Sequence, residues 1–425
     1  MFAWCSFDFA NSGYTTVIIT AVFNAYFVSV IAGDRPSATF LWTLALSVSY
    51  LLVLLTAPVV GAIADYSGSK KRFLVWTTSL CVLATGALAL AGPGDLWLAA
   101  VLIIISNTFY ATGENLIAAF LPELAPPEEL GKLSGYGWAW GYLGGLLSLG
   151  ACLVFLQWSG TMGLATADAV PYTALIVAGL FGLASLPTFL WLRERGEPSP
   201  QVRPRDYVAI GFSRLRTTLG EAREFRELFK LLICLTVYHS GINVVSTIAA
   251  VFAQAELGFT TTETIQLILV VNISAAAGAF VFGPIQDRLG SKRTIAVTLL
   301  LWTATTLLAA TVYSKGMFFL IGNMAGIAIG SSQSAGRAMV GLFSPRGKTA
   351  EFFGLWGMAI KTSSILGPLS YGTLNFVTGS HRIAVLATTA FFIVGLLLLL
   401  PIDEARGRAA ARAYTERNSP PADPA

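Results

Sequence analysis

Twelve apolar runs, each long enough to cross a lipid bilayer, divide this chain of 425 residues. A transmembrane helix needs about 20 consecutive apolar residues. The composition agrees, because 55% of the residues are hydrophobic and only 12% are charged, whereas soluble domains carry about 25% charged residues. We therefore predict an all-α membrane protein with twelve transmembrane helices. The runs cover approximately residues 4–31, 38–63, 73–92, 96–121, 133–157, 170–192, 229–256, 263–284, 293–314, 317–343, 351–376 and 381–401.

The positions of the basic residues predict the orientation of the chain. Lys and Arg concentrate on the cytoplasmic side of membrane proteins. With a cytoplasmic N-terminus, only Arg35, Lys315 and Arg382 fall in segments on the opposite side, while Arg337 and Lys361 lie within runs. We expect a multi-pass protein of the plasma (inner) membrane with both termini in the cytoplasm.

A short charged loop occurs twice, half a chain apart. It reads GAIADYSGSKKR at Gly61–Arg72 and GPIQDRLGSKR at Gly283–Arg293, and each copy lies between two apolar runs. The glycine after each Asp allows a tight turn, and each Asp can meet the positive N-terminus of a neighbouring helix. Two copies at this spacing predict two related halves. The expected gating residues are Gly61, Asp65, Gly68, Lys71 and Arg72 in the first copy and Gly283, Asp287, Arg288, Gly290 and Arg293 in the second.

The halves and their connections are expected to divide the chain into four parts. Residues 1–192 and 229–402 form two pseudo-symmetric six-helix bundles. Residues 193–228 form a cytoplasmic linker, and the stretch Tyr207–Phe229 places Arg between Leu and Phe at helical spacing. This pattern fits an amphipathic helix at a membrane surface, and it fits a solvated connector equally well. Residues 403–425 end in NSPPADPA and are expected to be a disordered cytoplasmic tail.

Four charged residues fall inside the apolar runs. A charge at the bilayer centre costs about 2.5–3.5 kcal/mol on insertion scales, so each one needs a reason. The acids Asp8 and Glu114 belong to the first half, and the bases Arg337 and Lys361 belong to the second. Polar neighbours on the same helical faces predict a wet cavity between the halves. The candidate residues for substrate binding or coupling are Asp8, Asn11, Glu114, His239, Asn243, Gln333, Arg337 and Lys361.

The four charges allow three interpretations. Asp8 is close enough to the N-terminus to be an interfacial helix cap. Glu114 with Arg337, or Asp8 with Lys361, would form a purely structural ion pair between the halves. In the functional interpretation, the acids face the ammonium group of a zwitterionic solute and the bases face its carboxylate.

Other polar and aromatic residues in the runs are weaker candidates. A lone histidine such as His239 is more often a satisfied hydrogen-bonding residue than a proton carrier. Trp138, Trp140 and Tyr142 lie in the fifth run, where aromatic residues at this density usually pack.

The sequence contains no pattern typical of an enzyme. It has no P-loop lysine, so ATP does not drive the chain directly, and no cluster of His and carboxylates indicates a hydrolase. Two histidines leave little scope for a metal site, and no basic face indicates nucleic-acid binding. We expect no catalysis, no cofactor and no metal. The cysteines, which lie far apart in apolar runs and are interpreted as packing residues, are Cys5, Cys81, Cys152 and Cys234.

The duplicated loop resembles the signature between the second and third helices of the major facilitator superfamily. The first copy departs from that signature, since Tyr66 stands where a basic residue commonly follows the Asp. Four longer segments resemble one branch, the unknown major facilitator family, which is related to the autophagy-linked amino-acid effluxers of eukaryotic vacuoles. These segments are Trp4–Phe27 (WCSFDFANSGYTTVIITAVFNAYF), Leu133–Gly145 (LSGYGWAWGYLGG), Tyr238–Thr260 (YHSGINVVSTIAAVFAQAELGFT) and Ala350–Pro368 (AEFFGLWGMAIKTSSILGP).

The resemblance implies a secondary transporter with the major facilitator fold. The family often has an Asp just before the glycine of the seventh run, where this chain has Ser240, so an ion or proton role is not expected at that position. The residues that match motif positions of the family are Asp8, Asn11, Gln333, Arg337 and Lys361.

The expected function is secondary active transport of a small polar or zwitterionic, amino-acid-like solute across the bilayer by alternating access. Glu114 is the first candidate for proton coupling and Asp8 the second. Asp65 is expected to meet the eleventh run near Ala350, and Asp287 the fifth run near Lys132. We expect a monomer whose partners are its solute, the lipid and protons. The alternatives are export of an amphipathic compound, such as a drug or lysolipid, and a membrane sensor that does not transport.

Overall fold

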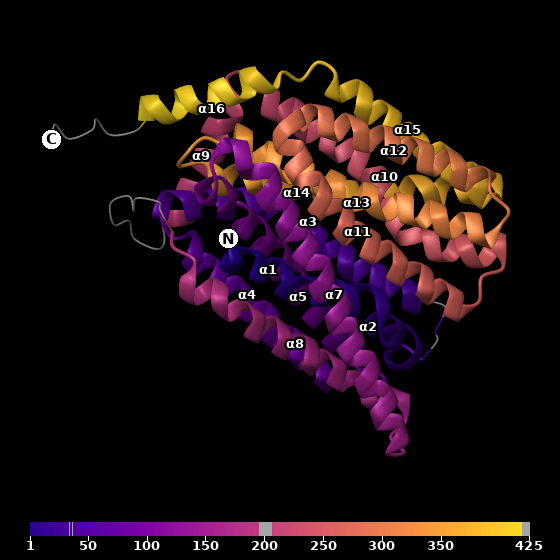
Figure 1. Cartoon of the computed structure of the whole chain (residues 1–425). Helices are drawn as coiled ribbons and strands as arrows, with labels where there is room; N and C mark the ends of the chain where they lie inside the picture. Colours follow the sequence, from indigo (N-terminus) through magenta and orange to yellow (C-terminus); the bar gives the residue numbers. More distant parts are fainter. Residues whose placement is uncertain (34, 36, 195–205, 419–425) are drawn as a thin grey trace.

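The computed structural model describes residues 1–425 except residues 34, 36, 195–205 and 419–425, and it arranges the chain as two helical bundles (Figure 1). The helices of the first bundle are α1 (Phe2–Gly13), α2 (Phe23–Tyr26), α3 (Ala38–Ser67), α4 (Lys70–Ala87), α5 (Leu96–Ala118), α6 (Leu121–Leu124), α7 (Leu130–Thr161) and α8 (Thr166–Trp191). Those of the second are α10 (Arg226–Leu257), α11 (Thr261–Leu289), α12 (Ser291–Thr311), α13 (Lys315–Phe343), α14 (Thr349–Thr378) and α15 (His381–Leu399).

Each of the twelve predicted runs is helical. Ten of the helical segments are long and apolar enough to cross a membrane by length and composition. Two further long helices, α13 and α14, are not among these ten; α13 carries Arg337 and α14 carries Lys361. Both lie inside the bundle against other helices, where polar side chains can face a cavity instead of lipid.

The first run differs from a regular α-helix. After α1 it continues as a π-helix at Tyr14–Ala21, the turn α2, and a second π-helical segment at Phe27–Ile31. Three threonine hydroxyls in or beside the first π-helix donate back to carbonyls of the preceding turn, Thr15 and Thr16 to Ser12 and Thr20 to Thr16. Such bonds and the wider turn distort the helix.

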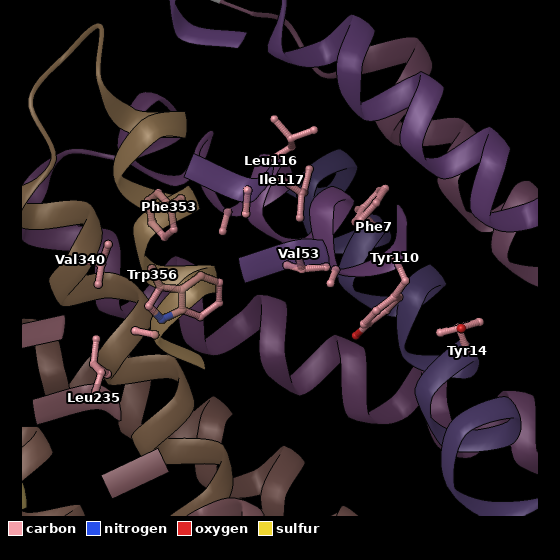
Figure 2. Packing of buried hydrophobic residues seen from close by; sticks show 14 of the residues in the cluster. Phe7, Tyr14, Val53, Tyr110, Leu116, Ile117, Leu235, Val340, Phe353 and Trp356 are labelled. Carbon is pink, nitrogen blue, oxygen red and sulfur yellow. The ribbon is translucent and has the colours of Figure 1, made fainter. Parts of the chain in front are cut away.

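The two halves meet mainly along two helix pairs, α3 with α14 and α7 with α11. Buried apolar residues of both halves also form one shared core (Figure 2). Phe7 and Ile117 come from the first half, and Val340 and Phe353 come from the second. This packing places α1, α5, α13 and α14 around the centre of the molecule, where the four charged residues lie.

In the described part of the chain, two helices lie outside the bundles, at the end of the molecule where the N-terminus lies (Figure 1). We call this end the terminal face. Helix α9 (Tyr207–Gly220) forms within the predicted linker and packs on α3. Of the predicted linker, residues 195–205 lie outside the described residues.

The expectation of a disordered tail is wrong for α16 (Glu404–Asn418). This segment is rich in Ala and Arg, which are strong helix formers. Its first turn is capped by Asp403, whose carboxylate accepts the Arg406 backbone N–H at 3.0 Å. The rest of the predicted tail, residues 419–425, lies outside the described residues.

Candidate functional site

A cavity of about 550 Å³ lies between the two halves. Its volume is in the range of small-molecule sites. From the four charged residues it extends toward the face opposite the termini, where apolar side chains such as Phe252, Leu267 and Phe318 line it. All eight residues predicted for substrate binding or coupling line this one cavity: Asp8, Asn11, Glu114, His239, Asn243, Gln333, Arg337 and Lys361.

Arg337 and Asp8 form a buried ion pair across the two halves. Arg337 Nη1 donates to Asp8 Oδ2 at 2.8 Å. Arg337 also donates from Nε to the Ser134 hydroxyl (3.1 Å) and from Nη2 to the Ser134 carbonyl (2.9 Å). The guanidinium group lies over the rings of Trp4 (4.6 Å) and Trp138 (5.2 Å). This arginine is therefore held by hydrogen bonds and aromatic contacts, with little freedom to receive a solute.

Lys361 and Glu114 form the second pair of charges, and it is looser. Lys361 Nζ and Glu114 Oε2 are 3.7 Å apart, beyond hydrogen-bond distance. The ammonium group lies 5.5 Å from the centre of the Tyr50 ring. Both side chains line the cavity and keep some exposure, 11% for Lys361 and 21% for Glu114.

The predicted pairings of Glu114 with Arg337 and of Asp8 with Lys361 are wrong. Helix α14, which carries Lys361, packs against α5, which carries Glu114, while α13 packs against α7 beside α1. Neighbouring helices therefore determine the partners. Asp8 is also not a helix cap, because Met1 occupies the N-cap of α1 and Asp8 is buried beside Arg337.

The remaining predicted residues of the second half add polar groups to the cavity wall. The Tyr142 hydroxyl donates to Gln333 Oε1 at 2.5 Å, which joins α7 to α13. Asn243 Nδ2 donates to the Ser363 hydroxyl at 3.0 Å. His239 stacks on Tyr238, with ring centroids 4.8 Å apart. In the first half, Asn11 accepts a long hydrogen bond of 3.4 Å from the Ser12 hydroxyl.

On the terminal face, the first duplicated loop closes against α14. Asp65 Oδ2 accepts the backbone N–H of Glu351 at 2.8 Å, as expected for an acid that faces a helix N-terminus. This contact confirms the prediction that Asp65 meets the eleventh run near Ala350. Gly61 is required here, because a Cβ would collide with the backbone of Ala350.

The second loop closes against α7 in the same way. Asp287 accepts the backbone N–H groups of Gly131 (2.8 Å) and Lys132 (2.9 Å). The predicted contact near Lys132 is thus confirmed. A Cβ on Gly283 would lie 2.9 Å from the Gly131 carbonyl oxygen, so the two helices approach closely only with glycine there. We call these contacts the first latch (Asp65) and the second latch (Asp287).

Comparison with known proteins identifies the family. The family model described as "Vacuole effluxer Atg22 like" matches residues 24–412. This chain belongs to the Atg22-like family. It is 25% identical over 409 residues to an uncharacterized transporter of the major facilitator type, YxiO of Bacillus subtilis, covering 95% of this chain and 94% of that protein. It is also 25% identical over 411 residues to Autophagy-related protein 22 of Kluyveromyces lactis, covering 88% and 82% of the two chains.

Solved structures support the fold. The proton:xylose symporter XylE matches with a TM-score of 0.74 and 14% identity, over 97% of this chain and 98% of that chain. The human organic anion transporter MFSD10 matches with a TM-score of 0.71 and 15% identity, over 94% and 98%. At such identities only the fold carries over. The predicted major facilitator fold is therefore confirmed, and this member of the Atg22-like family is a multi-pass membrane transporter.

The other predicted gating residues surround the two latches. Gly68 and Gly290 have positive φ angles of 56° and 88°, which glycine adopts without strain. Lys71 Nζ donates to the Leu192 carbonyl at 2.6 Å. The remaining predicted gating residues have exposed side chains on the terminal face: Arg72, Arg288 and Arg293.

An acid that the sequence analysis missed caps the helix after each loop. Glu194, after α8, accepts the backbone N–H groups of Lys70 (2.6 Å) and Lys71 (3.1 Å). Burial raises the pKa of Glu194, and these two N–H groups oppose that rise. In the second half, Glu404 accepts the Lys292 backbone N–H at 3.0 Å. The signal for these caps in the sequence was an acid that follows closely after the sixth apolar run and again after the twelfth.

Sequence reasoning also undervalued some aromatic residues. Trp138 and Tyr142, which the sequence makes weak candidates for lining the cavity, do line it and contact charged or polar groups of α13. Trp140 packs against Phe9, with ring centroids 5.7 Å apart. Within the described part of the chain, no group of three or more His, Cys, Asp or Glu side chains is arranged to hold a metal ion.

Proposed function

We propose that this transporter carries a small zwitterionic, amino-acid-like solute, which binds between Glu114 and Lys361. The observation that carries the proposal is the geometry of this pair. One charge comes from each half, the two groups are 3.7 Å apart, and both line the cavity. A solute ammonium group would approach Glu114 and a solute carboxylate would approach Lys361, so each replaces the weak attraction between the side chains.

The Asp8–Arg337 pair is a less suitable binding site for the solute carboxylate. Arg337 already donates three hydrogen bonds, to Asp8 and to Ser134. A solute carboxylate would have to displace these partners, which leaves a buried acid unpaired at a cost of several kcal/mol. By sequence alone, Arg337 and Lys361 are equal candidates for the solute carboxylate; our proposal assigns it to Lys361 alone.

We infer transport by alternating access from the two latches. Both close the terminal face while the cavity extends to the opposite face. Release of both latches, together with the Asp8–Arg337 pair, would let the halves rock and open the terminal face. We further propose that both termini are cytoplasmic, that the membrane is the plasma (inner) membrane and that the carrier works as a monomer.

Proton coupling would follow from the same exchange of partners. Glu114 can meet either the solute ammonium group or a proton, but not both at once. A proton on Glu114 would remove the negative charge that attracts the ammonium group, so binding of the proton and of the solute would be linked. Glu114 is accordingly the proposed coupling residue, and Asp8 is not, since no group of the solute is assigned to it.

The test is flux in proteoliposomes with a panel of labelled amino acids, with and without an imposed pH gradient. The wild type should move at least one of them, faster with the gradient, and Glu114→Gln should lose this acceleration. Glu263→Gln is the matched control, because Glu263 pairs with Lys315 outside the cavity at 2.7 Å and Gln keeps the capping box of α11. A gradient response that survives in Glu114→Gln would contradict the coupling.

A second candidate is export of an amphipathic compound. The observation in its favour is the apolar wall of the outer cavity, which includes Phe252, Leu267, Phe318 and Ile321. If no amino acid moves although the protein is folded, efflux of a fluorescent lysolipid from the same proteoliposomes tests this alternative.

A further inference from the structure

The first duplicated loop lacks a cation that the second one has. Tyr66 follows Asp65, whereas Arg288 follows Asp287. Helix α9 places a cation at this position from elsewhere in the chain. The Arg214 guanidinium group lies over the Tyr66 ring, 5.6 Å from its centre, which is within the range of a cation–π contact. Arg214 Nη2 also donates to the carbonyl of Gly347, two residues before α14, at 3.3 Å.

The same helix holds the residue that precedes α14. Lys348 Nζ donates to Thr218 Oγ1 and to Glu221 Oε2, both at 2.8 Å, and its side chain is 4% exposed. Its ammonium group lies over the ring of Phe225 at 5.5 Å and that of Tyr414 at 4.7 Å. A buried ammonium group needs partners of this kind. Lys348 is therefore fixed by residues before α10 and by α16 together.

Helix α16 adds two more contacts to the same region. The backbone N–H of Arg346 donates to Thr415 Oγ1 at 3.1 Å. Arg417 and Glu224 form an ion pair at 2.9 Å on the surface. The segment from Arg346 to Thr349, which enters α14, thus contacts α3, α9 and α16.

We propose that α9 is a working part of the first latch. It supplies through Arg214 the cation that the loop lacks at Tyr66, and it holds Lys348 so that the N-terminus of α14 faces Asp65. Because α9 contacts α3 of the first half and the entry to α14 of the second, it stabilises the state that is closed at the terminal face. Arg214 and Lys348 are positioning residues for the gate, and Asp65 is the group that they serve.

This inference rests on the alternating-access part of the proposed function and is independent of the solute. The backbone N–H of Glu351, which donates to Asp65, reports on the latch directly. Hydrogen exchange of the first turn of α14 in proteoliposomes measures how often the latch opens, and no solute is needed.

The decisive variants exchange the source of the cation. Arg214→Ala should speed exchange at the first turn of α14 about fivefold, which corresponds to ~1 kcal/mol. Tyr66→Arg alone should speed it more, because two guanidinium groups then face each other. The double variant Tyr66→Arg, Arg214→Ala should return to within about twofold of the wild type. Arg216→Ala is the matched control, since Arg216 is an exposed arginine of the same helix.

Two results would overturn the inference. One is exchange in Arg214→Ala that equals exchange in Arg216→Ala. The other is a double variant no slower in exchange than Tyr66→Arg. Lys348→Met gives an independent reading, since Met keeps the aromatic packing and loses the bonds to α9; exchange at the first turn of α14 should again rise, and unchanged exchange would count against α9.

Flux measured on the same samples separates this inference from the proposed function. Altered exchange in a protein that moves no amino acid leaves the role of α9 intact and removes the zwitterion proposal. If amino-acid flux is normal and hydrogen exchange is unchanged by substitution of Arg214 and Lys348, the role of α9 is refuted and the proposed function is supported.

Discussion

The two ion pairs that join the halves of this transporter differ in the distance between their charged groups and in the exposure of their side chains. Asp8 and Arg337 are 2.8 Å apart, and the arginine side chain is 3% exposed. Glu114 and Lys361 are 3.7 Å apart, and each is more exposed than its counterpart: 21% against 10% for the acids and 11% against 3% for the bases. Both pairs line the same cavity and cross the same interface, so the difference lies in the partners around them.

The surroundings of each base account for the contrast. Arg337 has Ser134 as a further acceptor and two indole rings beside its guanidinium group. A planar guanidinium group suits such a fixed arrangement, whereas an ammonium group on a flexible stem accepts new partners easily. The first pair thus resembles a structural joint between the halves, and the second an adaptable binding site.

Removal of Arg337 should have the largest effect. Arg337→Ala leaves Asp8 buried without a counter-charge, which destabilises the protein by about 3–5 kcal/mol. Thermal unfolding in detergent and flux should both fall sharply. Arg337→Ala, Asp8→Asn, which also removes the acid, should recover part of the stability; no recovery would show that the two residues do not act as a pair.

Removal of Lys361 should separate binding from stability. Lys361→Met should change the unfolding free energy by less than about 1 kcal/mol, since the pair is loose and partly wet, and it should weaken solute binding at least tenfold, about 1.4 kcal/mol. Calorimetric binding and thermal unfolding of the same sample provide the two numbers. A large loss of stability with unchanged affinity would reverse the roles of the two pairs.

Substitution of Ser134 should have a smaller effect, confined to the Asp8–Arg337 pair. Ser134→Ala removes the hydroxyl that accepts from Arg337 Nε and leaves the carbonyl contact, so we expect a stability loss of about 1 kcal/mol and unchanged solute affinity. Ser364→Ala is the matched control beside the loose pair, because its hydroxyl donates only to the Ile360 carbonyl among the described contacts. Equal effects of the two substitutions would remove the distinction.

The smallest effect should come from Asp403, an exposed charge outside both pairs. It provides a reference against which the effects of the two pairs are compared. The Arg406 backbone N–H lowers the pKa of Asp403 at the start of α16. Its contribution is present above the unfolded pKa of about 3.9 and is lost as the pH falls through the lower folded value. The protection of the first turn of α16, measured as the exchange rate relative to the intrinsic rate at each pH, should fall in that window in the wild type and stay constant there in Asp403→Asn.

Much of the fold could be predicted from the sequence, because apolar length and the duplicated loop constrain it strongly. The latch contacts of Asp65 and Asp287 were also predictable. Each acid lies at the end of its helix, where the positive N-terminus of a neighbouring helix can meet it. The eight cavity residues followed from polar groups on apolar helices, which are costly unless they face a cavity.

The pairing of the charges could not be predicted from the sequence. Asp8 and Glu114 are equally plausible partners for Arg337 until the neighbours of α13 and α14 are known. The sequence analysis missed α16 because it applied the disorder expected for the Pro-rich end of the chain to the preceding Ala-rich segment as well. Arg214 was missed since its partner Tyr66 is distant in sequence, although the absent cation in the first loop was a visible signal.

The central claim, that Lys361 receives the solute carboxylate while Arg337 does not, is tested most directly with a pair of solutes. Binding of the transported amino acid and of its decarboxylated amine is measured by calorimetry to the wild type, Lys361→Met and Ser134→Ala. The account predicts that the wild type and Ser134→Ala prefer the amino acid at least tenfold, and that Lys361→Met binds both equally. A preference that persists in Lys361→Met and disappears in Ser134→Ala, where Arg337 is loosened, would contradict the account.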